Sequence, residues 1–161
     1  MQFIAWWLTN IGIEWSSKIA EHTWIVGGNS WANIGNTTVK NSYTNEIVNP
    51  ATNTTYNAKI GLMYVSDYGY AASPANWNTN MGSLNNDTNR NNNWMFMGLY
   101  EWTISRYLDD SYSAFGVGNS GRVDNLVGVD TGSAVRPSFY LEPSVAYISG
   151  DGSINLPFRI N

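Results

Sequence analysis

The chain contains no cysteine, and this absence excludes several kinds of site. A disulfide scaffold, a zinc site with thiolate ligands and a thiol nucleophile all require cysteine. Charged residues make up only 12% of the 161 residues, about half of the usual share. The net charge is −4 and the few Lys and Arg are scattered, without a basic stripe. We therefore expect no nucleic-acid partner.

The chain also lacks an uninterrupted apolar run of membrane length near its N-terminus. Glu14 and Lys18 interrupt the apolar segment that begins at Phe3, and no basic residue precedes that segment. The sequence therefore predicts no signal peptide. We expect a longer natural N-terminus, and attachment to a membrane only through such a preceding segment.

Aromatic residues, in contrast, reach 14% of the chain, and Asn, Ser, Thr and Gly carry most of its polarity. The high content of Trp and Tyr argues against disorder. Small neutral polar residues favour turns and loops over helix interiors, which makes an all-α fold improbable. The length suits one domain with a real core. We predict a single α+β domain over residues 1–161.

The apolar pattern predicts one early helix followed by short strands. Residues 3–19 have a broad apolar face at near-helical spacing, although Gly12 disfavours a helix interior by about 1 kcal/mol. The predicted strands cover residues 23–26, 39–48, 56–65, 95–104, 112–117, 122–129, 135–141, 146–148 and 158–160. We expect the helix to pack on a twisted, mainly antiparallel sheet with long irregular loops, and the two ends of the chain to lie near each other.

Two features bear on metal sites. His22 is the only histidine, and without a second histidine or a cysteine nearby we expect it to cap or edge the core. Asp87 lies in the Asn-rich stretch 85–93, whose carboxylate and amide oxygens suit calcium. That stretch lacks the residue order of an EF-hand, so a hydrogen-bonded loop is the simpler interpretation. We predict no cofactor, and calcium is the one ion that the sequence leaves open.

Glu101 stands among aromatic residues in a predicted strand, where a carboxylate has two interpretations. As a general acid with a raised pKa it would need a second carboxylate within about 5–10 Å for glycoside hydrolysis. The candidates are Asp109, Asp110 and Asp124, but no motif pairs them with Glu101. As a structural residue it would form an ion pair with Arg136. We favour the ion pair and predict no catalytic residue.

The segment between residues 106 and 130 is rich in Tyr, Asn, Ser, Gly and Arg, which adaptable paratopes use. An ordinary solvated loop pair is the alternative. The ligand-binding residues that we predict are Tyr107, Asp109, Asp110, Tyr112, Asn119, Arg122, Asp124 and Asn125. We expect them to be exposed on one side of the domain. The aromatic residues that we expect to be buried beneath them are Trp94, Phe96, Trp102, Phe115 and Phe139.

Glu101-Trp102-Thr103, residues 113–117 and residues 135–141 together resemble the closing half of a known family. The family is the formylglycine-generating-enzyme (sulfatase-modifying-factor) branch of C-type-lectin-like domains. That branch has a Glu-Trp-Thr-like strand, a Gly/Ser-rich loop and an Arg-containing last strand in this order. Residues 61–71, 148–152 and 157–160 are similar to uncharacterised surface modules of gut Firmicutes and Mollicutes, and this resemblance covers about residues 58–160.

The resemblance implies a C-type-lectin-like fold with a ligand surface between the Glu-Trp strand and the last strand. The formylglycine-generating enzymes use cysteine for turnover, so their activity does not transfer to this chain. Glu142-Pro143-Ser144 echoes the calcium-dependent sugar motif only in part, and the Trp-Asn-Asp strand motif is absent.

These observations lead to one functional expectation with two alternatives. We expect a non-catalytic, adhesin-like module, displayed outside a bacterial cell or on its surface, that binds a host or cell-surface glycan or protein. The first alternative is a pilin-like structural subunit of a surface fibre. The second is an enzyme that acts on polysaccharide, with Glu101 as its acid.

Overall fold

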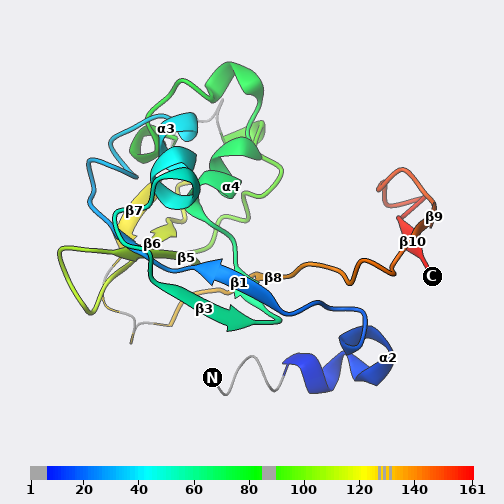
Figure 1. Cartoon of the computed structure of the whole chain (residues 1–161). Helices are drawn as coiled ribbons and strands as arrows, with labels where there is room; N and C mark the ends of the chain where they lie inside the picture. Colours follow the sequence, from blue (N-terminus) through cyan, green and yellow to red (C-terminus); the bar gives the residue numbers. More distant parts are fainter. Residues whose placement is uncertain (1–6, 85–89, 127, 129, 131) are drawn as a thin grey trace. The chain divides into compact units, whose positions relative to one another are not determined.

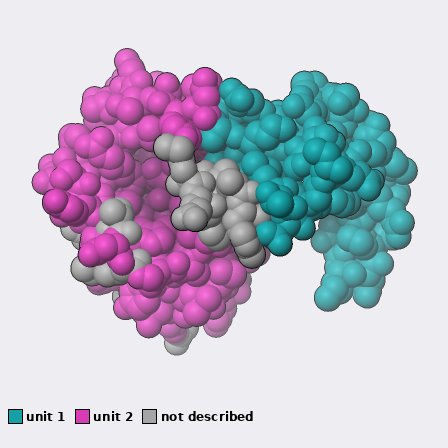
Figure 2. All heavy atoms as spheres, turned by 90° about the horizontal axis from the view of Figure 1, so that it is seen from below, with its two compact units in different colours: residues 1–22, 58–60, 139–161 teal, residues 23–57, 61–138 magenta. Residues whose placement is uncertain are grey.

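The computed structural model describes residues 7–84, 90–126, 128, 130 and 132–161, and only the backbone of Asn125 and Leu126. The chain combines short helices with several small sheets (Figure 1), so the predicted α+β class is confirmed. It divides into two compact units (Figure 2). Unit 1 comprises residues 1–22, 58–60 and 139–161, and unit 2 comprises residues 23–57 and 61–138.

Unit 1 brings together segments from both ends of the sequence, as predicted. Residues 7–10 are helical and are followed by α2 (Gly12–Ser16), but Gly12 has a φ of +82° and breaks the predicted continuous helix. Ile19 and Leu141 form an antiparallel bridge. The predicted terminal hairpin is confirmed, since β9 (Tyr147–Ser149) pairs with β10 (Arg159–Ile160) in antiparallel orientation.

The largest sheet belongs to unit 2 and is mainly antiparallel. Its strands, in spatial order, are β2 (Gly28–Asn29), β5 (Glu101–Tyr107), β6 (Ala114–Val117) and β7 (Val123–Leu126). Only β2 and β5 run parallel. The predicted hairpin of β6 and β7 is confirmed. The strand predicted from Met95 begins only at Glu101, because the chain turns at Gly98, which has a φ of +71°.

Two smaller sheets contain strands that are shorter than those predicted from the sequence. β1 (His22–Ile25) pairs with β3 (Thr55–Ala58), and β4 (Gly61–Leu62) pairs with β8 (Pro137–Ser138). The predicted strand 56–65 is therefore interrupted after Ala58, and the predicted strand 135–141 is reduced to two residues.

The predicted strand over residues 39–48 is wrong. The segment is helical, with α3 (Val39–Tyr43) followed by a π-helical turn (Thr44–Val48). Its buried residues are Val39, Ser42 and Glu46, which have helical spacing. Two of these three are polar, so the hydrophobic pattern gives no sign of the face that is buried.

A second helix, α4 (Val65–Tyr70), connects α3 to the main sheet. α3 packs against α4, and α4 packs against β5 and β6 (Figure 1). The Asp67 carboxylate accepts a hydrogen bond of 2.8 Å from the Tyr64 N–H and thereby caps the start of α4. Two short 3₁₀ turns, Pro74–Asn76 and Met81–Ser83, follow.

The core of unit 2 is formed between these helices and the sheet. Its fully buried apolar residues include Ile34, Met63, Val65, Tyr68, Met81, Leu84, Phe115, Val117 and Val123. The predicted burial of Phe115 is confirmed, whereas Phe96 and Trp102 are only partly buried. The prediction is wrong for Trp94 and Phe139, which are 79% and 42% exposed. Neither lies in a strand, so the alternation of buried and exposed positions does not apply to them.

Candidate functional site

The Glu101 carboxylate is 2% exposed and forms the predicted ion pair with Arg136. The Arg136 Nε donates to Oε1 at 2.8 Å and Nη2 donates to Oε2 at 3.2 Å, so both carboxylate oxygens are engaged. Nη2 also donates to the Met95 carbonyl at 2.7 Å. A bidentate pair of this kind fixes both partners geometrically. Glu101 therefore joins β5 to the segments that carry Met95 and Arg136.

Glu46 is a second buried acid, and the sequence gives no sign of it. Its carboxylate accepts hydrogen bonds from the Val65 and Ser66 N–H groups at 3.1 and 2.9 Å, and from the Ser105 hydroxyl. Burial raises the pKa of Glu46 to about 7, although these hydrogen bonds act in the opposite direction. Glu46 thus ties the π-helical turn to the start of α4 and to β5.

Part of the predicted ligand surface lies in the loop between β5 and β6. Asp109, Asp110 and Tyr112 are exposed there, while Tyr107 is half-buried against Phe115 with ring centroids 5.4 Å apart. The Asp110 carboxylate accepts hydrogen bonds of 2.8 Å from the Tyr112 N–H and from the Ser113 hydroxyl. These bonds lower the pKa of Asp110 and fix the loop.

The other predicted residues lie in the loop between β6 and β7 or just after it. Asn119 and Arg122 are exposed, and Arg122 forms an ion pair with the half-buried Asp124. The side chain of Asn125 is outside the described residues. Strand β6 separates this loop from the preceding one, so the two loops lie at opposite ends of the β5–β6–β7 meander. The predicted residues therefore form two groups and not one surface.

An open pocket of about 340 Å³ in unit 2 adjoins the exposed Trp94. Helix α4 provides Asp67 and Tyr70, the segment before β5 provides Trp94, and β8 provides Ser138. The remaining lining residues are Met63, Ala71 and Met95. We call this site the Trp94 pocket. It combines aromatic surface with one carboxylate and one aliphatic hydroxyl.

Contacts with residues outside the lining support two of the segments that form the Trp94 pocket. The Tyr70 ring packs edge-to-face on Trp77 with centroids 5.0 Å apart. Asn93 fixes the segment that carries Trp94, because its amide donates to the Tyr68 carbonyl and accepts from the Met95 N–H, each at 2.9 Å. The pocket is therefore built on a supported frame, as ligand sites commonly are.

The chemistry available at the Trp94 pocket is that of recognition by stacking and hydrogen bonding. Burial raises the pKa of Asp67 above its ordinary value, although the hydrogen bond from the Tyr64 N–H acts in the opposite direction. Asp67 is the one acidic side chain among the lining residues that the structure describes. The sequence analysis does not predict this pocket, because it expects Trp94 to be buried beneath the predicted ligand surface.

His22 is half-buried and its ring packs on Tyr140 with centroids 4.0 Å apart, in keeping with an edge-of-core residue. Asp87 lies outside the described residues, so the calcium prediction stays a prediction. Within the described part of the chain, no group of three or more His, Asp or Glu residues could hold a metal ion. None of the described helices is long and apolar enough to cross a membrane.

Comparison with known proteins adds no relative: no family model, no curated protein and no solved structure matches the chain.

Proposed function

We propose that this chain is a non-catalytic, adhesin-like module that binds a glycan of a host or cell surface at the Trp94 pocket. The observation that carries the proposal is a Trp ring that is 79% exposed at the edge of a supported pocket containing Asp67 and Ser138. A large aromatic side chain left in water beside polar side chains is typical of a binding site.

A saccharide fits this combination of groups. The C–H face of a sugar ring is apolar and can stack on the indole of Trp94, while its hydroxyl groups can donate to Asp67 and bond with Ser138. The volume of about 340 Å³ lies near the lower end of the usual range for ligand pockets, which is about 300–1,000 Å³. We therefore expect the pocket to bind a terminal sugar unit and not a long stretch of chain.

The way in which the acids are used supports the proposal of binding without hydrolysis. Glycoside hydrolysis requires two carboxyl groups facing the scissile bond. Asp67 is the carboxylate that lines the described part of the pocket, while Glu46 and Glu101 are both occupied by hydrogen bonds within the protein. These arrangements support a structural role for the buried acids and a recognition role for Asp67.

The assignment to a C-type-lectin-like fold and to the bacterial surface is part of the same proposal. Support for the fold comes from the resemblance of residues 101–103, 113–117 and 135–141 to that family. Support for extracellular display comes from the low content of charge and the abundance of Asn, Ser and Thr.

Screening the purified protein on a glycan array, followed by calorimetric titration of the best ligand, tests the proposal. Trp94→Ala should weaken binding by at least about tenfold, which corresponds to about 1.4 kcal/mol. Asp67→Asn should weaken binding as well. Trp15→Ala is the matched control, because Trp15 is also an exposed tryptophan but lies in unit 1.

A further variant separates the pocket from the loop surface predicted by sequence. Tyr112→Ala removes the most prominent exposed aromatic group of the β5–β6 loop and should leave glycan binding unchanged. Loss of binding in Tyr112→Ala with full binding in Trp94→Ala would contradict the pocket assignment and move the ligand site to that loop.

A further inference from the structure

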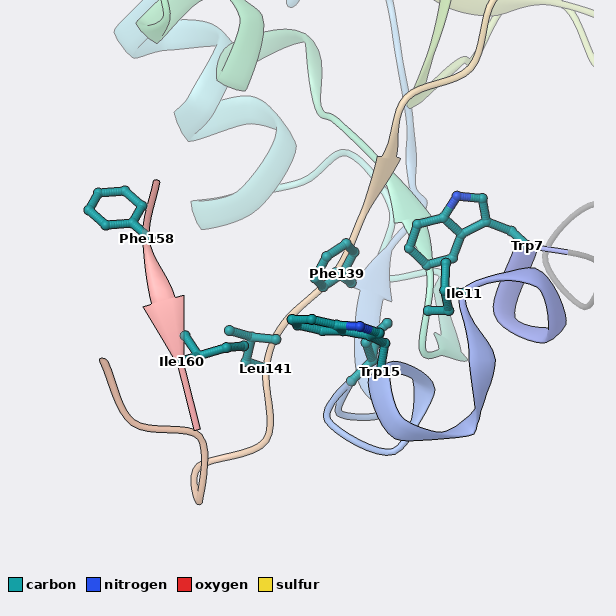
Figure 3. Close-up of a pocket in the computed structure, with 8 residues that line it drawn as sticks. Trp7, Ile11, Trp15, Phe139, Leu141, Phe158 and Ile160 are labelled. Atoms are coloured by element: carbon teal, nitrogen blue, oxygen red, sulfur yellow. The ribbon is translucent and has the colours of Figure 1, made fainter. Parts of the chain in front are cut away.

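The Trp94 pocket differs from a larger hollow in unit 1 in having a charged group in its lining. The hollow in unit 1 has a volume of about 590 Å³ and is lined by aromatic and aliphatic side chains, among them Trp15 and Phe139 (Figure 3). The Trp94 pocket combines the Asp67 carboxylate with the aromatic side chains of Tyr70 and Trp94. A charge in the lining discriminates between ligands of different charge, which apolar surface alone does not.

The carboxylate and the aromatic side chains border the same hollow because of how α4 meets the segment before β5. Asp67 and Tyr70 lie on one face of α4, three positions apart, and Ala71 ends the helix on that face. The Trp94 N–H donates to the Ala71 carbonyl at 3.4 Å. The backbone of Trp94 is therefore held beside the face of α4 that carries Asp67.

The Asp67 carboxylate can accept hydrogen bonds from a ligand in addition to the one that it accepts within the protein. Its Oδ2 accepts from the Tyr64 N–H at 2.8 Å. Within the described part of the chain, no other donor and no basic side chain lies within bonding distance of this carboxylate. A carboxylate has two oxygens and about four acceptor positions, so most of its capacity is left for a ligand.

The basic side chains nearby do not offset the charge of Asp67. Arg136 reaches the backbone of one lining residue, since its Nη2 donates to the Met95 carbonyl, but its guanidinium forms the bidentate ion pair with Glu101. Lys40 belongs to α3, which packs against α4, and it does not line the pocket. Among the lining residues that the structure describes, none is basic. The lining therefore carries a net negative charge.

We infer that the sugar unit bound at the Trp94 pocket carries a positively charged amino group, as in a glucosamine unit without its acetyl group. This inference rests on the function proposed above and adds the charge of the ligand to it. The ammonium group would lie between Asp67 and the ring of Trp94 or Tyr70, because carboxylates and aromatic faces both attract cations.

The same arrangement distinguishes an amino sugar from other ligands. A cation without a sugar ring would leave the Ser138 hydroxyl without a ligand partner, whereas the hydroxyl groups of a sugar can bond with it. Sugars that carry a carboxylate, such as sialic or uronic acids, should be disfavoured because their charge has the same sign as that of Asp67.

Calorimetric titration of the purified chain with matched disaccharides of glucosamine tests the inference. Acetyl, trimethyl and succinyl substituents on the amino groups give neutral, permanently cationic and anionic sugars. The trimethylated sugar should bind about tenfold more tightly than the acetylated one, which corresponds to about 1.4 kcal/mol. The unsubstituted disaccharide, whose amino groups are partly protonated at neutral pH, should also bind more tightly than the acetylated one. The succinylated sugar should bind most weakly.

Substitutions assign this preference to a single carboxylate. Asp67→Asn should weaken the trimethylated sugar more than the acetylated one and so reduce the preference for the cation. Asparagine keeps an oxygen for the Tyr64 N–H, so the start of α4 stays capped. Asp109→Asn is the matched control, because it removes the same charge from an exposed position that does not line the pocket. Trp94→Ala should weaken both sugars.

Several outcomes overturn the inference and leave the proposed function standing. One is that the acetylated sugar binds as tightly as the trimethylated one while Trp94→Ala weakens both. Another is that Asp109→Asn reduces the preference as much as Asp67→Asn, since the net charge of the chain would then be its cause. A third is that choline binds as tightly as the trimethylated sugar, which would mean that the pocket recognises a cation without a sugar ring. The proposed function itself fails if no glycan binds, or if Trp94→Ala leaves the binding of every sugar unchanged.

Discussion

The buried carboxyl group of Glu46 should make the stability of this protein depend on pH in an unusual direction. Burial raises its pKa from 4.5 to about 7 in the folded chain. In the unfolded chain the group returns to its ordinary value. At pH values between these two pKa values, the folded state therefore binds the Glu46 proton more tightly than the unfolded state does.

The sign and size of the effect follow from that difference. The stabilisation is fully present below the unfolded pKa of 4.5 and is lost as the pH rises through the folded pKa of about 7. A difference of this size corresponds to about 3 kcal/mol, since each pKa unit is worth about 1.4 kcal/mol. The free energy of unfolding should thus decrease as the solution becomes neutral, opposite to the trend for acids with lowered pKa such as Asp110 and Asp151.

Glu46→Gln isolates this contribution from those of the other acids. Glutamine carries no proton that titrates in this range, so the variant should lack the decrease between about pH 4.5 and 7.5. The amide has only one acceptor oxygen for the Val65 and Ser66 N–H groups, which should lower stability at all pH values by about 1–3 kcal/mol. Ser105→Ala removes a hydrogen bond that lowers the Glu46 pKa, so this variant should shift the decrease to higher pH.

Urea unfolding followed by tryptophan fluorescence, at pH values from 4.5 to 8, measures these free energies for both proteins. The difference between wild type and Glu46→Gln is the quantity to follow, because Asp67, Asp110 and Asp151 titrate in both. The wild-type advantage should shrink as the pH rises. Parallel pH profiles, or an advantage that grows with pH, would refute the claim that burial outweighs the hydrogen bonds at Glu46.

Further substitutions test the framework of unit 2. Arg136→Met should cost about 3–5 kcal/mol in urea unfolding, because it leaves the buried Glu101 carboxylate without its partner. The double variant with Glu101→Gln should recover part of that loss, and failure to recover any of it would show that Arg136 acts mainly through other contacts. Phe115→Ala should cost about 3–5 kcal/mol because it empties a fully buried site. Trp94→Ala should change stability by no more than about 0.5 kcal/mol, and an equal loss in both would argue that Trp94 packs in the core.

Local patterns made part of this fold predictable. The β6–β7 hairpin and the β9–β10 pair were predicted because a strand, a Gly-rich turn and a second strand are all encoded within a short stretch. The Glu101–Arg136 pair was predicted because each charge stands in an otherwise aromatic segment. A charge there needs a partner, and the sequence offers few.

Features that depend on buried polar groups were not predictable in this way. α3 and the turn after it hide Ser42 and Glu46, so the hydrophobic period that marks a helix is missing from the sequence. The burial of Glu46 becomes understandable only when the free N–H groups at the start of α4 are known, since these groups are its partners. The two groups of loop residues likewise appear as one cluster in the sequence. Strand β6 between them is short in sequence, but it places the two loops at its opposite ends in the fold.

Sequence patterns do not predict the Trp94 pocket for a related reason, and the frame of this pocket links stability to the proposed function. Trp94 stands between two residues that are held by side chains: Asn93 bonds to the Tyr68 carbonyl, and the Met95 carbonyl accepts from Arg136. Arg136 is itself fixed by Glu101. The exposed indole therefore projects from a short segment whose backbone is restrained on both sides by buried polar contacts. A side chain on a restrained backbone segment loses less conformational freedom on binding than one on a loose loop would. The buried ion pair thus helps to hold the backbone that carries the exposed Trp94.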